Sequence, residues 1–248
     1  MSFPRPFKFA LPVAAALALV ACGSGGDAEA DIAGEPIAEI PAPEGTQWTD
    51  MVQVTEADGY LVGNPDAPIK LIEYGSLTCG ACANFAATGV PSLKEEYVNS
   101  GRVSFELRNQ IHNGIDLTMA RMVRCGSPEA FHPLADQVWA NLGQILQAAQ
   151  KNPQGIEAAM ALPEDQRFVQ VAETTGLLDF FAARGLSADQ ARTCLADAES
   201  VQAIAERSDE QSRELGVTGT PTFFINGRKI DVNSWAALEP LLQQAGAR

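Results

Sequence analysis

Two cysteines separated by two residues are the strongest chemical signal in this sequence. Cys79 and Cys82 follow an apolar run over 69–74 that is typical of a strand, and the residues after them are typical of a helix. Two thiols at this spacing can open and close a disulfide. The free N–H groups and the dipole at a helix start stabilise a thiolate on the first sulfur. We therefore predict that Cys79 is the attacking thiol and Cys82 the resolving thiol.

A second motif lies far downstream, where Thr220 and Pro221 precede an apolar run over 223–225. An X-Pro bond is the usual place for a cis peptide. A cis proline before a strand would face the dithiol, and Thr220 would offer its backbone N–H and C=O to an extended client segment. The two motifs together, in this order, favour redox chemistry.

Zinc binding is the competing interpretation of Cys79 and Cys82. His112 or His132 would have to complete the ligand set, because the sequence has no second Cys-x-x-Cys pair. Both histidines fall in a region that we expect to be helical and separate from the thiols. We therefore expect no metal and no cofactor.

The N-terminus has the pattern of an export signal. Arg5 and Lys8 precede an apolar stretch over 9–20, which is short for a membrane span. The stretch ends in Leu-Val-Ala-Cys at 19–22, which resembles the bacterial lipobox, so Cys22 is the expected site of lipid attachment. Ordinary cleavage with an unmodified Cys22 is the alternative.

Lipidation of Cys22 would leave four of the five cysteines as thiols. Besides the close pair, these are Cys125 and Cys194, each in or at the end of an expected helix. An exported chain meets an oxidising environment, so we predict a structural disulfide between them. Two buried free thiols are the alternative.

The composition limits the classes of partner. With 248 residues and 46% hydrophobic content, the chain can bury a substantial core. Its formal net charge of −14 argues against nucleic acid and against an anionic membrane surface as partners. We expect membrane contact through a lipid anchor only.

The order of expected elements gives an α/β fold with a helical insert. Two strands flank a long helix that Gly89 and Pro91 should kink. Helices, including one over 129–150, then precede a further helix, a hairpin at Asn226-Gly227 and a last helix. The predicted divisions are a signal peptide (1–21), a flexible tether (22–50), the first part of the α/β domain (51–110), the insert (111–197) and the second part (198–248).

At this point the sequence resembles a known family. The segments 59–68, 73–85 and 216–228 are similar to the DsbA-like branch of the thioredoxin superfamily. The resemblance implies a thioredoxin fold with an inserted all-helical subdomain and a periplasmic thiol-disulfide oxidoreductase. Its partners would be exported proteins with cysteine thiols or disulfides and an unidentified membrane redox protein. The chain has no room for a separate dimerisation domain, so we expect a monomer.

The resemblance also assigns roles by position. It gives Pro221 the place of the cis proline, and it gives Glu73 that of a buried acid beneath the dithiol, which could take the proton of Cys82. A solvent-facing strand glutamate is the alternative. Gly80 and Ala81 depart from the family, since many relatives carry proline or histidine there. We therefore expect Cys79 to be less acidic, and its redox couple less oxidising, than in the most oxidising members of the family.

The direction of electron flow stays open between an oxidase, which we favour, and a reductase or isomerase. A lipid-anchored, non-catalytic binding or chaperone-like module is the hypothesis from another class. In such a module the Cys79–Cys82 pair would be structural, and its double serine variant would still bind clients.

Overall fold

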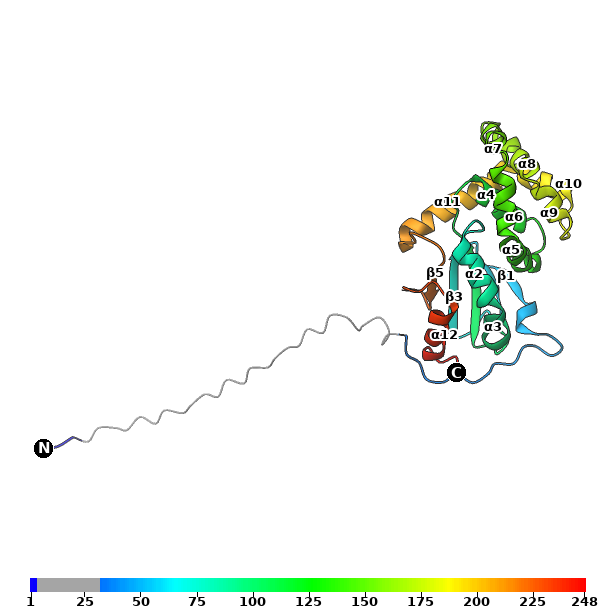
Figure 1. Cartoon of the computed structure of the whole chain (residues 1–248). Helices are drawn as coiled ribbons and strands as arrows, with labels where there is room; N and C mark the ends of the chain where they lie inside the picture. Colours follow the sequence, from blue (N-terminus) through cyan, green and yellow to red (C-terminus); the bar gives the residue numbers. More distant parts are fainter. Residues whose placement is uncertain (4–31) are drawn as a thin grey trace.

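The computed structural model describes residues 1–3 and 32–248, and the chain from residue 32 onward is built around one mixed sheet (Figure 1). The predicted lipidation site, Cys22, lies outside the described residues. The sheet has six strands in the order β1-β2-β4-β3-β5-β6. Their bounds are β1 Val52–Val54, β2 Tyr60–Val62, β3 Ile69–Gly75, β4 Val103–Asn109, β5 Thr222–Ile225 and β6 Arg228–Ile230.

The pairing directions decide which strand ends meet. β3 and β4 run parallel, whereas β5 runs antiparallel to β3 and pairs Phe223 with Glu73. The β5–β6 hairpin turns at Asn226 and Gly227, which both have positive φ angles as a tight hairpin turn requires. The ends of β3 and β4 and the start of β5 therefore lie at one edge of the sheet.

Two helical segments cover one face of the sheet (Figure 1). α2 (Gly80–Thr88) continues through α3 (Val90–Ser92) and a π-helical turn at Leu93–Val98, and α12 spans Trp235–Gln244. The Phe85 ring from α2 lies 4.7 Å from the Phe223 ring of β5 and 6.4 Å from Trp235 of α12. Phe85 and Phe223 are fully buried, so this aromatic contact joins both helices to the core.

Helices fill the predicted insert, at one end of the sheet (Figure 1). They are α4 (Gly114–Val123), α5 (Phe131–Ala140), α6 (Leu142–Gln150), α7 (Pro153–Met160), α8 (Glu164–Thr175), α9 (Leu177–Ala182) and α10 (Ala188–Ala196), with a short 3-10 turn at Pro128–Ala130. The long α11 (Ala198–Leu215) leads back to the sheet domain. A disulfide between Cys125 and Cys194, with Cα atoms 5.9 Å apart, joins the end of α4 to α10.

The prediction of one continuous helix over 129–150 is wrong, because the structure has two helices there, α5 and α6. Asn141, with φ −114° and ψ 12°, separates α5 from α6, because a side chain of this kind competes for backbone hydrogen bonds. The helix α7, which the sequence analysis did not predict, begins at Pro153 after Asn152. The Asn152 side chain accepts the Gly155 N–H, a favourable N-cap.

The predicted flexible tether over 22–50 is wrong for residues 32–50, which are bound to the domain. The N–H of Ile37 bonds to the carbonyl of Gly246 and that of Ile40 to Ser100, both at 2.9 Å. The buried Trp48 donates its indole N–H to the Ile40 carbonyl at 2.7 Å and opens a short 3-10 helix, Trp48–Asp50. Apolar side chains placed among the polar residues of this segment anchor it to the domain.

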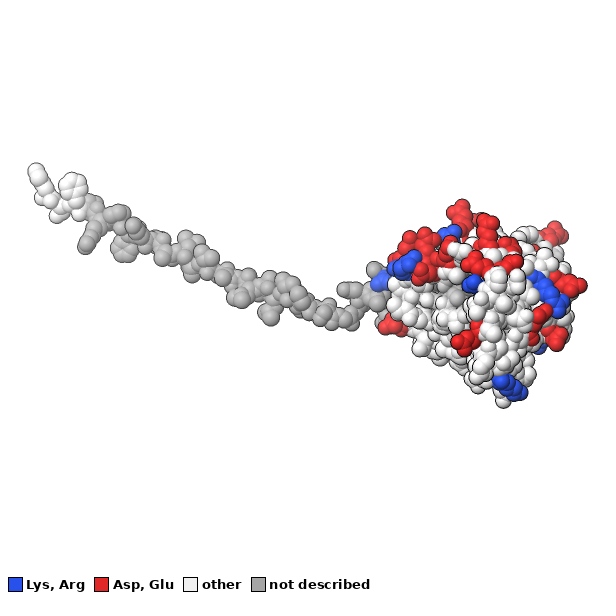
Figure 2. Space-filling model, turned by 90° about the horizontal axis from the view of Figure 1, so that it is seen from above, with Lys and Arg blue, Asp and Glu red and all other residues white. Residues whose placement is uncertain are grey.

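The surface agrees with the acidic composition. Figure 2 shows one face of the molecule, on which acidic side chains outnumber lysine and arginine. Among residues 1–3 and 32–248, no helix is both long and apolar enough to span a bilayer.

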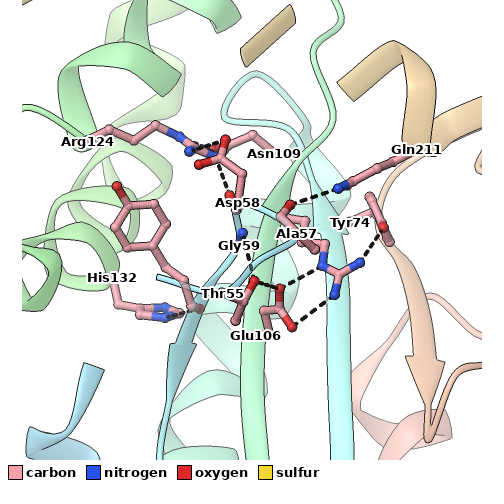
Figure 3. A network of polar contacts seen from close by, with 12 residues as sticks. Thr55, Ala57, Asp58, Gly59, Tyr74, Glu106, Asn109, Arg124, His132 and Gln211 are labelled. Carbon is pink, nitrogen blue, oxygen red and sulfur yellow. Dashed lines mark hydrogen bonds and ion pairs between the residues drawn. The ribbon is translucent and has the colours of Figure 1, made fainter. Parts of the chain in front are cut away.

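Polar contacts fix the insert and α11 to the turn between β1 and β2 (Figure 3). Arg124 at the end of α4 pairs with Asp58 at 2.8 Å and is 6% exposed, and Gln211 of α11 donates to the Ala57 carbonyl at 2.7 Å. On the neighbouring strand, Arg108 bonds to Glu106 at 2.7 Å. The contacts of Arg124 and Gln211 set the orientation of the insert and α11 relative to the sheet.

Candidate active site

The two close cysteines lie at the junction between β3 and α2. Cys79 is the N-cap of α2, and its sulfur accepts the backbone N–H of Cys82 at 3.2 Å. Cys79 is partly exposed, whereas Cys82 is fully buried, and both are free thiols. A client sulfur can therefore reach only the first of the two.

The second predicted motif lies against this junction. The Thr220–Pro221 peptide bond is cis, and the Cys79 sulfur lies 3.3 Å from the Thr220 carbonyl oxygen, to which it donates when it is protonated. The antiparallel pairing of β5 with β3, which sets Thr222 opposite Tyr74, brings the loop before β5 to the sulfur. Proline has no N–H, so the backbone groups that a client can reach here are those of Thr220.

The pKa values of the two thiols are shifted in opposite directions. The pKa of Cys79 is lowered to about 5, mainly by hydrogen bonding from the Cys82 thiol, although burial acts in the other direction. The Thr220 hydroxyl and the backbone N–H groups of Ala81 and Cys82 lower it further. Hydrogen bonding to Cys79 and burial raise the pKa of Cys82. At neutral pH the accessible sulfur is thus a thiolate and the buried one a thiol.

Glu73 lies in the core beneath the dithiol. Its side chain projects to the same face of β3 as Leu71, toward α2, and it is fully buried. Neither carboxyl oxygen has a hydrogen-bond partner among residues 1–3 and 32–248. Burial, followed by the charges of Asp136 and Cys79, raises the pKa of Glu73 well above its ordinary value. Burial therefore favours the protonated form of Glu73, and the interpretation as a solvent-facing residue is wrong.

The dipeptide between the thiols leaves the site open. Gly80 and Ala81 are exposed, and a Cβ atom added at Gly80 would meet no atom within 4 Å. The pair adds no charged side chain. The hydrogen bonds to the Cys79 sulfur come instead from the helix start, the second thiol and Thr220.

Two residues of the insert hold the segment before Cys79, and the sequence analysis missed both functions. The buried Asp116 of α4 accepts the Ser76 hydroxyl at 2.7 Å and the Leu77 N–H at 2.8 Å. Trp139 of α5 donates its indole N–H to the Ser76 carbonyl at 3.0 Å. An acid in the first turn of a helix and an aromatic residue in the insert are common features, so neither signals a contact with a distant loop.

The histidines of the zinc interpretation lie apart. The His132 imidazole is buried with Nε2 2.9 Å from the Tyr60 carbonyl, and burial lowers its pKa to about 3. His112 lies at the active-site edge, with Nε2 3.4 Å from the Thr220 hydroxyl oxygen. Across the part of the chain that the structure describes, no group of three or more His, Cys, Asp and Glu side chains could hold a metal ion.

Comparisons with known proteins agree with this geometry. A protein-disulfide isomerase from Novosphingobium aromaticivorans has a similar structure, with a TM-score of 0.69 and 28% identity over 74% of this chain and 94% of that one. Alpha-DsbA1 of Wolbachia pipientis has a TM-score of 0.61 and 21% identity over 78% and 93%. Disulfide bond formation protein D of Bacillus subtilis is 22% identical over 172 residues, 68% of each chain.

The helical insert and the dithiol beside a cis proline define the class as that of the DsbA-like thiol-disulfide oxidoreductases. The chain belongs to the thioredoxin family, whose model matches residues 55–244. The predicted fold class and the resemblance stated from the sequence are both confirmed.

Proposed function

We propose that this protein oxidises thiols of exported proteins in the periplasm through the Cys79/Cys82 pair. The observation that carries the proposal is the Cys79 sulfur, which accepts the Cys82 N–H at 3.2 Å and faces the carbonyl before the cis proline at 3.3 Å. An accessible thiolate is a good leaving group, and a low pKa stabilises the reduced enzyme, so the couple is poised to accept electrons.

The oxidising cycle takes two electrons from a client. A client thiolate attacks the Cys79 sulfur of the enzyme disulfide, and the Cys82 sulfur leaves and takes a proton. A second client thiolate attacks the client sulfur of this mixed disulfide. Cys79 then leaves as a thiolate, the client holds a disulfide and the enzyme a dithiol. An unidentified membrane redox protein accepts the two electrons and restores the enzyme disulfide.

Glu73 is the proposed proton donor to Cys82. When the buried Cys82 sulfur leaves as a thiolate, the neutral acid beneath it can supply the proton, and in the reducing direction the carboxylate can take it back. When Glu73 is ionised, its charge raises the pKa of Cys82, so the two groups are coupled. A charge on either group is costly in this core, and transfer between them avoids two buried charges.

Thr220 is the proposed docking residue for the client backbone. Its N–H and C=O can pair with an extended segment that carries the reacting cysteine, and such pairing needs no particular client sequence. Gly80 and Ala81 leave the other side of the sulfur open.

Isomerase activity is the second candidate, and the name of the Novosphingobium protein favours it. An isomerase attacks wrong disulfides with Cys79 and releases them rearranged, without net transfer of electrons. Refolding of a scrambled disulfide protein, compared with oxidation of a dithiol peptide, measures the two activities separately.

We further propose that export is followed by lipid attachment at Cys22, which would hold the enzyme at a membrane as a monomer. The apolar stretch over 9–20 and the Leu-Val-Ala-Cys sequence support this. Metabolic labelling with a fatty acid, compared between the chain and its Cys22→Ser variant, tests it.

Cys82→Ser tests the main proposal. The reduced variant should form a stable mixed disulfide with a disulfide-containing client, because the resolving thiol is absent. Mass mapping should place the link at Cys79. Cys79→Ser should trap nothing, since Cys82 is fully buried. Equal trapping by both variants, or none by Cys82→Ser while the fold is kept, would refute the assignment.

A further inference from the structure

His112 contacts the client-docking residue from the helical insert. It lies in the loop between β4 and α4, and its Nε2 atom is 3.4 Å from Oγ1 of Thr220. Its side chain is exposed, unlike that of His132, so the hydrophobic core does not require it. From the sequence, the only function considered for His112 is that of a zinc ligand.

The loop that carries His112 is held by three backbone donors. The N–H of Gln110 bonds to the Gly75 carbonyl at 2.9 Å, and that of Ile111 to the Ser208 hydroxyl of α11 at 2.8 Å. The His112 N–H bonds to the Asp116 carboxylate at 2.9 Å. Each N–H of the loop from 110 to 112 therefore has a partner, and these hydrogen bonds hold the backbone that carries the His112 imidazole.

The Asp116 carboxylate also holds the other side of the site. It accepts the Ser76 hydroxyl and the Leu77 N–H from the segment that leads to Cys79. One buried carboxylate thus fixes both the approach to the nucleophile and the loop that presents His112. The first turn of the insert bridges the two sides of the reactive sulfur.

The contact with Thr220 has a chemical consequence. The Thr220 hydroxyl is one of the groups that lower the pKa of Cys79, as a donor to that sulfur does, and its oxygen lies 3.4 Å from His112 Nε2, from which it can accept. In that arrangement the histidine proton occupies a lone pair of the oxygen, and the hydroxyl hydrogen is left to point at the sulfur. Removal of the imidazole would free the hydroxyl to rotate toward water.

We infer that His112 is a positioning residue for thiol-disulfide exchange, which holds the Thr220 hydroxyl toward the Cys79 sulfur and flanks the client segment docked on Thr220. The inference rests on the proposed function, since it assigns a role within that site. His112 acts through Thr220 rather than on the reacting sulfurs.

The test compares His112→Ala and His112→Gln with the wild-type chain. Gln154→Ala, at an exposed position in α7 that is far along the chain from the site, is the control. The measurements are the pKa of Cys79, from the pH dependence of its alkylation, and kcat and KM for oxidation of a dithiol peptide. A weak hydrogen bond is worth roughly 0.5–1 kcal/mol, so His112→Ala should lower kcat/KM about two- to fivefold.

The same substitution should raise the pKa of Cys79 by about 0.4–0.7 unit. His112→Gln keeps a donor near the place of Nε2 and should recover most of both effects, with an unchanged melting temperature. In a Thr220→Val background, which lacks the hydroxyl, His112→Ala should have no further effect on the pKa of Cys79.

Several results would overturn the inference. One is an active wild-type enzyme whose His112→Ala variant keeps its kinetics and its Cys79 pKa. Another is a loss of kcat/KM in His112→Ala that His112→Gln does not recover. The third is an effect of His112→Ala on the pKa of Cys79 that is undiminished in the Thr220→Val background. A wild-type chain without peptide oxidation would instead refute the proposed oxidase, and the His112 effect on the pKa of Cys79 would still test the contact.

Discussion

The acidity of Cys79 should make the stability of the reduced protein depend on pH. In the folded chain its pKa is about 5, whereas a thiol in an unfolded chain titrates near about 8.5. Between these two pH values the unfolded reduced chain binds one more proton than the folded chain. The reduced form therefore gains stability as pH rises through this window and loses it as pH falls through about 5.

The magnitude follows from the width of the window. One proton corresponds to about 1.4 kcal/mol per pH unit, so a window of about 3.5 units sets an upper limit of about 5 kcal/mol. Cys79 is partly exposed, and water screens the hydrogen bonds to its sulfur, so we reduce this limit by half. The expected gain is about 2–3 kcal/mol, or about 5–10 °C in melting temperature for a domain of this size.

Glu73 contributes with the opposite sign. Its pKa is raised, so the folded chain holds its proton more tightly than the unfolded chain, and stability falls as pH rises above about 4.3. This contribution is present in both redox forms because burial is its main cause. The difference between the reduced and oxidised proteins at each pH removes most of it and isolates Cys79.

The assay is thermal or urea unfolding of the reduced and the oxidised protein at a series of pH values from about 5 to about 8.5. The oxidised form has no Cys79 thiol to titrate, so the reduced-minus-oxidised stability should rise with pH. Cys79→Ala, which has no thiol at this position and forms no active-site disulfide, is the matched control, and its stability should follow the pH dependence of the oxidised protein. A difference that stays flat in the wild type would show that Cys79 is not acidic and would refute our account of the couple.

Two other substitutions follow from buried groups. Glu73→Leu should stabilise the protein by about 1–3 kcal/mol at neutral pH, because it removes an unpartnered buried carboxyl. The gain should shrink below about pH 4, where the carboxyl of the unfolded chain is protonated as well. Turnover of the variant should be slower at neutral pH, and a destabilised variant with normal turnover would exclude the proposed proton donor. Cys125→Ala with Cys194→Ala should cost about 2–4 kcal/mol in urea unfolding, because their disulfide closes a long loop. Their alkylation profile at Cys79 should not change, and a shifted profile would contradict a purely structural bond.

Local patterns were enough to predict the elements that form the site. The strand before Cys79, the helix after it and the hairpin at Asn226-Gly227 each follow from a few adjacent residues, and the structure contains all three. The position of Pro221 beside the thiols was expected from the Thr-Pro motif before a strand and from the family resemblance, because no local pattern brings two such distant segments together.

Other features depend on contacts that local patterns do not contain. The burial of Glu73 follows from the face of β3 that packs on α2, and alternation along one strand does not tell which face that is. The order of residues 32–50 depends on Gly246, near the other end of the chain. Asp116 and Trp139 look like ordinary helix residues until the fold brings them to Ser76.

The convergence of three loops on Cys79 follows from the directions of three strands. β3 and β4 are parallel neighbours, so their carboxyl ends share one edge of the sheet, and the loop after β4 must lie beside the start of α2. β5 is antiparallel to β3, so the cis proline at its start reaches that same edge. The insert leaves the sheet at the end of β4, and its first residues, including His112 and Asp116, are therefore the part of it that can contact both the nucleophile and the docking loop.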